Sequence, residues 1–273
     1  MANGHCPQIA LEEDVMSTAT KEYTQKRRIG IVCTVGTRDL TLDGQTAEKL
    51  GKAGNTEFAS PRKLGKEILD DWDNLSKRIA FPIIQPVIDS AFERARSSQG
   101  EIVYLLLVGT DQPTLIEETH REKDTAYFTE VAVNYYSQQS QRPSKSFQAK
   151  RLLYPMNPTR MDIAWNYLQQ KASKECFTEL RNCDQVFLST TGGVPGLNQA
   201  LLMFLFSEVC GRNLSFVHVD EDLQRPIPIE IVQHLTRLET IHRIEAYVET
   251  FDFAAMAREL LEEDQEGIRL IAQ

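Results

Sequence analysis

The chain has 273 residues, of which 41% are hydrophobic and 25% are charged, and this composition is typical of a globular protein with a sizeable core. The net charge of −9 argues against a broad binding surface for duplex DNA, which requires clustered Lys and Arg side chains. Apolar runs stay shorter than the roughly 18 residues of a membrane span, and residues 1–27 lack the apolar core of a signal peptide, so we expect no membrane partner.

The first half of the chain predicts two strands separated by an insertion and a helix. Residues 28–34 and 102–108 are nearly continuous in Val, Ile and Leu, as in strands that are covered on both faces of a parallel sheet. Residues 41–80 are rich in glycine and charge, and we expect them to form an insertion at the ligand end of the sheet, with one short helix over 64–75. A helix that runs to about residue 97 then leads into the second strand.

The second half predicts three further strands that alternate with helices. Such alternation predicts right-handed βαβ units, and therefore an α/β, Rossmann-like doubly wound, mostly parallel sheet. Asp124 is expected to cap the helix that follows the second strand, and His218 is expected to be a core histidine of the fifth strand. We expect helices over 125–137, from 159 or 162 to 168, and over 197–210, and strands over 147–154, 185–189 and 214–219.

The two ends of the chain differ from the part between them. We expect residues 1–27 to form a flexible arm, residues 28–222 the Rossmann-like domain, and residues 223–273 a C-terminal helical extension. Apolar residues recur at helical spacing in this extension, which indicates a face that docks on the core or on a second subunit. These residues are Ile231, Leu235, Leu238, Ile241, Ile244 and Val248.

Residues 183–204 carry the strongest functional signal. The fourth strand ends in Ser189-Thr190-Thr191, a Gly192-Gly193 loop follows, and a helix begins near Leu197. The first N–H groups of a helix have no partner within it and its N-terminus is electropositive, so this turn suits an anionic ligand. The first two strands also end in Val-Gly-Thr. Because the carboxyl ends of parallel strands share one edge, the sequence predicts a polar crevice there.

Several familiar sites have no motif in this sequence. It contains no GxxxxGK[ST] phosphate loop, no GxGxxG dinucleotide turn and no GxSxG nucleophile turn. The five histidines and five cysteines show no metal-ligand spacing, so we predict no metal site and no cofactor. Cys33 and Cys210 lie inside apolar runs, as buried thiols do, and the absence of paired cysteine motifs fits a reducing cytoplasm.

The strand ends CTVGT, LLVGTDQ and FLSTTGGVPGLNQALL, in this order on an acidic α/β chain, resemble the CARF family, the CRISPR-associated Rossmann-fold sensors of prokaryotic type III immunity. The resemblance extends over about residues 28–222. It implies a cytoplasmic, prokaryotic homodimer of antiviral defence, whose two glycine-loop faces build one symmetric pocket for a cyclic oligoadenylate, an RNA ring. It also implies that binding of cyclic tetra-adenylate, or else cyclic hexa-adenylate, allosterically activates an attached effector, for which we find no motif in this chain.

Carried onto this sequence, the resemblance implies a ligand site at the ends of the first, second and fourth strands, with two residues past the third. For the two arginines of this site a solvated surface charge is the alternative interpretation, and for Asp111 a turn or cap residue. The implied ligand-binding residues are Gly36, Thr37, Arg38, Gly109, Thr110, Asp111, Gln112, Asn157, Arg160, Ser189, Thr190, Thr191, Gly192, Gly193 and Asn198.

One departure from the family pattern concerns cleavage of the ring. Many members carry a lysine soon after the glycine loop, whereas residues 193–198 of this chain read GVPGLN. A stand-alone ring nuclease, which cleaves by attack of a ribose 2′-hydroxyl, is the alternative function, with Thr37 or Thr190 as candidates to orient the reacting group. Two further alternatives are a sensor joined to a DNA-binding tail and an unrelated Rossmann-like enzyme that binds one nucleotide or S-adenosylmethionine per subunit.

Overall fold

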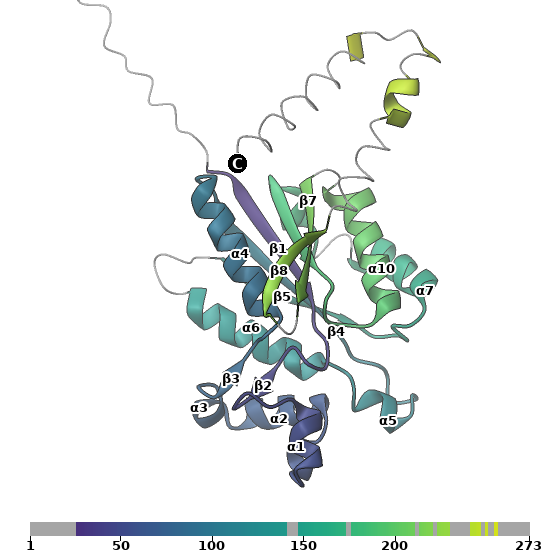
Figure 1. The fold of residues 1–273 in the computed structure, drawn as a ribbon. Helices are drawn as coiled ribbons and strands as arrows, with labels where there is room; N and C mark the ends of the chain where they lie inside the picture. Colours follow the sequence, from purple (N-terminus) through teal and green to yellow (C-terminus); the bar gives the residue numbers. More distant parts are fainter. Residues whose placement is uncertain are drawn as a thin grey trace, which may run out of the picture.

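The fold is built on one six-stranded sheet in the order β5-β4-β1-β6-β7-β8 (Figure 1). The computed structural model describes residues 26–140, 147–172, 176–210, 213–220, 223–229, 241–246, 249–250 and 254–255. The first five strands of this order are parallel and β8 is antiparallel to β7, so the expected Rossmann-like doubly wound α/β fold is confirmed. The strands are β1 (Arg28–Thr34), β4 (Glu101–Thr110), β5 (Gln148–Tyr154), β6 (Gln185–Ser189), β7 (Leu214–Asp220) and β8 (Arg225–Ile229).

Helices cover both faces of the sheet (Figure 1). The helices α4 (Ile84–Ser97) and α6 (Ala126–Ser140) lie on one face. The opposite face carries α7 (Met161–Tyr167), α9 (Thr178–Arg181) and α10 (Pro195–Phe204), with π-helical turns at Leu168–Ala172 and Leu205–Cys210. Among the described residues, we find no helix that combines the length and the apolar character needed to cross a membrane.

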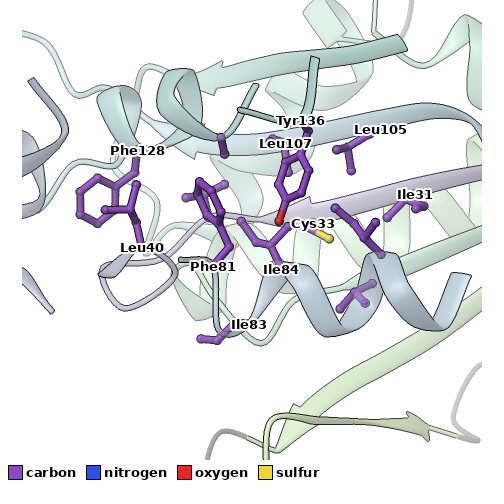
Figure 2. Close-up of a cluster of buried hydrophobic side chains, with 14 of the residues drawn as sticks. Ile31, Cys33, Leu40, Phe81, Ile83, Ile84, Leu105, Leu107, Phe128 and Tyr136 are labelled. Carbon is purple, nitrogen blue, oxygen red and sulfur yellow. The ribbon is translucent and has the colours of Figure 1, made fainter. Parts of the chain in front are cut away.

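Alternation along β1 explains why its sequence is almost wholly apolar. Ile31 and Cys33 belong to the core on the α4 and α6 face, whereas Val32 belongs to the core on the other face. Figure 2 shows Ile31 and Cys33 beside Leu105 of β4 and Tyr136 of α6. A strand that is buried on both faces has no position for a polar side chain until it reaches the edge of the sheet, and β1 reaches that edge at Thr34.

The expected insertion lies beyond the carboxyl ends of the strands, at the foot of Figure 1. The helix expected over 64–75 is divided into two helices, because the backbone leaves the helical conformation at Asp71, with φ −122° and ψ 51°. Ser60 caps the first of them by accepting a hydrogen bond from the Lys63 N–H at 3.3 Å. The elements at this end are β2 (Thr41–Leu42), α1 (Ala47–Lys52), the 3₁₀ turn Thr56–Phe58, α2 (Pro61–Asp70), α3 (Trp72–Leu75), β3 (Ile79–Ala80) and, after β4, α5 (Glu118–Arg121).

Strand β8 is an element that the sequence did not predict. Residues 225–229 fall within the expected C-terminal helical extension, yet they form a strand in which Pro226 and Pro228 pair with Val219 and Val217 of β7. A proline can occupy an edge strand where its nitrogen, which carries no hydrogen, faces away from the neighbouring strand. The sheet therefore continues past residue 222 and ends in an edge that is poor in hydrogen-bond donors.

Most of the predicted terminal segments lie outside the described residues. This holds for residues 1–25 of the expected arm and for Ile231, Leu235, Leu238 and Val248 of the expected apolar stripe. Residues 241–246 are helical, and the side chain of Ile241 there is 44% exposed.

Burial predicts that the cysteines differ in reactivity. Desolvation raises the pKa of the Cys33 thiol well above its ordinary value and that of Cys183 to about 11, so both hold little thiolate near neutral pH. We expect N-ethylmaleimide to alkylate the half-buried Cys176 at least about tenfold faster than Cys33 or Cys183 in the folded protein, as measured by peptide mass mapping. In guanidinium chloride the three rates should become equal. Equal rates in the folded protein would contradict the burial of Cys33.

Candidate functional site at the carboxyl edge of the sheet

The loops after β1 and β6 pack against each other where the strand order reverses, between β1 and β6. The Thr34 hydroxyl donates to the carbonyl oxygen of Gly192 at 2.8 Å. A Cβ atom on Gly192 would lie 2.0 Å from Asp39 Oδ2, and one on Gly36 would lie 2.6 Å from the nitrogen of Gly193. The structure thus brings two of the predicted loops into backbone contact, and glycine is required on both sides of it.

Asp39 is a site residue that sequence analysis missed. Its side chain is 0% exposed, and its carboxylate accepts a hydrogen bond from the Gly36 N–H within the β1 loop. The backbone closes the same turn, because the Asp39 N–H donates to the carbonyl oxygen of Gly36 at 3.3 Å. One signal was available in the sequence, because Asp39 directly precedes the apolar residue Leu40. In the structure Leu40 is buried.

Asn198 holds the glycine loop in place. Its side-chain nitrogen donates to the carbonyl oxygens of Thr190 at 2.9 Å and Gly192 at 2.7 Å. Gly193 adopts φ +77°, and a Cβ there would lie 2.7 Å from Asn198 Oδ1. Asn198 was predicted to contact a ligand, and in the structure its side-chain nitrogen is bound to the loop.

The N-terminus of α10 is less open than the sequence indicated. Pro195 at the first helical position has no N–H group, and the Leu197 N–H donates to the carbonyl oxygen of Pro158 at 2.9 Å. The loop after β5 lies so close that a Cβ on Gly196 would be 2.4 Å from the carbonyl oxygen of Thr159. The loop after β5 therefore fills space beside the helix N-terminus and accepts the Leu197 N–H, which the sequence analysis had expected to be open to an anion.

At the end of β4, Gly109 and Thr110 are buried and pack against the start of α6. The Thr110 N–H donates to the Thr125 hydroxyl at 3.2 Å, and the Thr125 N–H donates to the Thr110 hydroxyl at 3.4 Å. The Thr125 hydroxyl in turn donates to the carbonyl oxygen of Val35 at 2.9 Å. A Cβ on Gly109 would lie 2.1 Å from Thr129 Oγ1. These residues connect β4, α6 and the β1 loop beneath the rim.

Asp111 and Gln112 belong to an ion-pair cluster with the insertion. Arg62 of α2 lies 3.2 Å from Asp111 and 3.6 Å from Asp124, measured from its Nη1 to a carboxylate oxygen. Gln112 donates to Asp124 from its backbone nitrogen at 2.9 Å and from its side chain at 3.1 Å. Asp124 is 1% exposed and lies two residues before the start of α6, so the expected helix cap acts instead as the centre of this cluster.

The two residues predicted past β5 are both exposed and both engaged locally. Asn157 Oδ1 accepts hydrogen bonds from the backbone nitrogen of Thr159 at 3.0 Å and from its hydroxyl at 2.7 Å. Arg160 forms two hydrogen bonds with Asp162, at 3.0 and 2.7 Å, and these hold the pKa of the Asp162 carboxyl below its ordinary value. The Asp162 carboxylate therefore neutralises the charge of the Arg160 guanidinium.

The remaining predicted residues lie at the outer rim, except for Ser189 beneath it. Thr37 and Arg38 are exposed, Thr190 and Thr191 are half-buried, and Ser189 is buried at 2% exposure. The Thr191 hydroxyl accepts a hydrogen bond from the Val219 N–H of β7 at 2.8 Å and lies 3.3 Å from the hydroxyl of Ser189.

His218 was predicted to be a core histidine, and this prediction is wrong. It lies near the end of β7, its side chain is exposed, and its Nδ1 is 3.3 Å from the Thr191 hydroxyl. Its position in the strand explains the error, because an apolar pattern does not reveal where a strand leaves the cover of its helices.

Two hollows of the described surface lie away from this rim. A groove of about 910 Å³ runs between β3, α4, α6 and β8 and includes Phe81, Asp89, Tyr135 and Pro226 in its lining. A smaller one of about 280 Å³ lies between α2, α3 and α6. None of the predicted site residues lines either of them, so neither hollow coincides with the predicted crevice.

Comparison with known proteins finds matches among solved structures. The chain matches no protein-family model and no curated protein. Among solved structures it is similar to Csm6 of Enterococcus italicus bound to cyclic hexa-2′-fluoro-hexa-dAMP, at 10% sequence identity and a TM-score of 0.44. The match covers 87% of this chain and 50% of that protein, so the chain spans about half the length of that Csm6.

A first prediction tests the contact between the two loops. Gly192→Ala should destabilise the protein by about 3 kcal/mol, because the added Cβ would overlap the buried Asp39 carboxylate. Gly44→Ala is the control: Gly44 has φ +76° and nothing within 4 Å of its Cβ position, so only the backbone cost of about 1 kcal/mol applies. Denaturant unfolding measures both variants. Equal losses for the two would contradict the tight contact.

A second prediction concerns the ion pairs of the insertion. Arg62→Ala should cost about 1–2 kcal/mol, because the buried Asp124 carboxylate loses its charged partner and keeps only Gln112. Lys66→Ala on the same helix should cost less than about 0.5 kcal/mol, since Lys66 and Asp70 are exposed. Amide hydrogen exchange should speed up over 61–70 and 111–124 in Arg62→Ala alone. Unchanged exchange there would contradict the role given to Arg62.

Proposed function

We propose that this chain is a cyclic oligoadenylate-binding sensor of the CARF type. In this proposal it binds one RNA ring per homodimer in the cytoplasm of a prokaryote, and binding allosterically activates an effector of type III CRISPR antiviral defence. Cyclic tetra-adenylate is the favoured ring and cyclic hexa-adenylate the second. The observation that carries the proposal is the backbone contact between the β1 loop and the glycine loop at the switch point of the sheet.

The rim offers the chemistry that a phosphodiester ring requires. The exposed Thr37 and Arg38 supply a hydroxyl and a guanidinium, and the half-buried Thr190 and Thr191 lie on the adjoining loop. Hydroxyls, backbone N–H groups and a single cation suit an RNA ring of a few phosphates better than a broad basic patch, which the net charge of −9 opposes.

Symmetry supports a dimeric site. A ring of identical nucleotides has rotational symmetry, and a two-fold dimer presents each of its contacts twice. The rim residues line neither of the two hollows described above. A pocket that a second copy completes would supply the missing wall, and in this proposal the rim residues of the two copies face the same ring.

We assign the roles within the proposed site by exposure and by hydrogen-bond partners. We assign ligand contact to Thr37, Arg38 and Thr190, which reach the surface. Gly36, Gly192, Gly193 and Asn198 are assigned to shaping the loops, and Thr110, Asp111 and Gln112 to attaching the β4 loop to α6 and α2.

A binding experiment tests the proposal. Calorimetric titration with three-, four- and six-membered cyclic oligoadenylates should give one ring per two chains, with the tightest binding for the four-membered ring. Arg38→Ala should weaken binding about tenfold through loss of a charge-assisted hydrogen bond to phosphate. Arg96→Ala is the matched control, because Arg96 is exposed near the C-terminal end of α4, at the opposite end of the strands, and should leave binding unchanged.

Two outcomes would decide against this proposal. Failure of the wild-type protein to bind any of the rings would refute it. Binding of one mononucleotide or one S-adenosylmethionine per chain would favour an unrelated Rossmann-like enzyme instead. Chromatography of the same mixtures also separates a sensor from a ring nuclease, because a nuclease would convert the ring into linear products.

A further inference from the structure

His218 and Thr191 form a side-chain pair that the predicted site did not include as a unit. Thr191 lies in the loop just past β6, and His218 lies near the end of the neighbouring parallel strand β7: Leu188 of β6 pairs with Phe216 of β7, and His218 follows two residues further along β7. The Thr191 hydroxyl is 3.3 Å from His218 Nδ1 and 3.3 Å from the Ser189 hydroxyl. A buried hydroxyl, a half-buried hydroxyl and an exposed imidazole thus form a chain that leads from the core to the surface.

The backbone fixes this pair. The Val219 N–H donates to the Thr191 hydroxyl at 2.8 Å, so the residue that follows His218 anchors the hydroxyl that His218 contacts. With Nδ1 held against Thr191, Nε2 is the ring nitrogen that lies outside this contact. Because the imidazole is already oriented, a ligand that contacts Nε2 loses little further side-chain entropy on binding.

The segment around the glycine loop lacks basic side chains of its own. The sequence from Gln185 to Cys210, which includes the glycine loop and the whole of α10, contains no Lys, Arg or His. The N-terminus of α10 offers few donors, because Pro195 has none and Leu197 donates to Pro158. His218 therefore brings to this loop, from a different strand, a side chain that donates hydrogen bonds and can carry positive charge.

We infer that His218, oriented through Nδ1 by Thr191, contacts a phosphodiester of the ligand through Nε2. This inference rests on the proposed function and deepens it: it names the group that takes the place of a cation on the β6 side of the rim. Ser189 and the Val219 N–H hold Thr191, Thr191 holds the imidazole, and the imidazole binds the anion. Thr191 is a positioning residue in this arrangement and His218 is a binding residue.

The test compares variants in calorimetric titrations with cyclic tetra- and hexa-adenylate. His218→Ala should weaken binding of the preferred ring about tenfold, the loss expected for a hydrogen bond from a charged or polarised donor to phosphate. His242→Ala is the matched control, because His242 is exposed in the helical segment 241–246 and should leave binding unchanged. Thr191→Val should weaken binding about threefold or more, and Thr191→Ser, which keeps the hydroxyl, should restore it.

A spectroscopic measurement separates orientation from mere stability. In long-range ¹H–¹⁵N spectra of the histidine side chains, binding of the cyclic oligoadenylate should shift the His218 Nε2 resonance of the wild-type protein. Thr191→Val should change the His218 tautomer in the free protein, while His242 stays as it is. His218→Ala binding as tightly as the wild type, or an Nε2 resonance that the bound ring does not move, would overturn this inference alone. Failure of the wild type to bind any ring would overturn the proposed function together with it.

Discussion

The arrangement of the rim depends on one contact between segments 158 residues apart in the sequence, Thr34 and Gly192. The β1 loop and the glycine loop approach until their backbones touch, which is possible only because Gly36 and Gly192 have no side chains. The buried carboxylate of Asp39 fills the turn beside them and satisfies the Gly36 N–H. The exposed Thr37 and the half-buried Thr190 owe their relative positions to this contact.

A second set of buried polar groups connects the rim to the rest of the fold. Thr125, at the start of α6, binds both Thr110 of β4 and the carbonyl oxygen of Val35 in the β1 loop. Arg62 and Asp124 extend the connection to the insertion helix α2. Since buried polar groups are costly to leave unpaired, these elements favour moving together. Under the proposed function, a displacement of the β1 loop by a ligand would act on α6 and the insertion through these bonds.

The chemistry of the rim differs from the pattern that its sequence first indicates. A glycine loop before a helix usually presents the helix N-terminus to an anion. In this protein the loop after β5 covers that terminus by accepting the Leu197 N–H on Pro158. Side-chain hydroxyls of the β6 loop and the imidazole of His218 reach the surface beside it. Under the proposed function, this arrangement would let an acidic chain bind a small anion without a basic patch.

The sequence by itself determined the five parallel strands of the sheet. Buried strands such as β1 and β6 must be apolar on both faces, and this requirement left runs of Val, Ile and Leu whose ends were predicted to within a few residues. It also located the loops with glycine, because close approach leaves no other choice of residue. Strand β8 escaped prediction, since edge pairing depends on a neighbour that local sequence does not specify and proline usually ends a strand.

Only the tertiary structure decided which residues of those loops face outward. Thr110 and Thr37 follow glycines in the same Val-Gly-Thr motif, yet Thr110 is buried against Thr125 and Thr37 is exposed. Their difference arises from what packs above each strand end, α6 over β4 and open solvent beside β1. The same holds for His218: no segment covers its side chain enough to bury it, and its partner Thr191 comes from the loop after the neighbouring strand β6. Local sequence sets the conformation of a segment, whereas the exposure of a side chain depends on distant segments that fold over it.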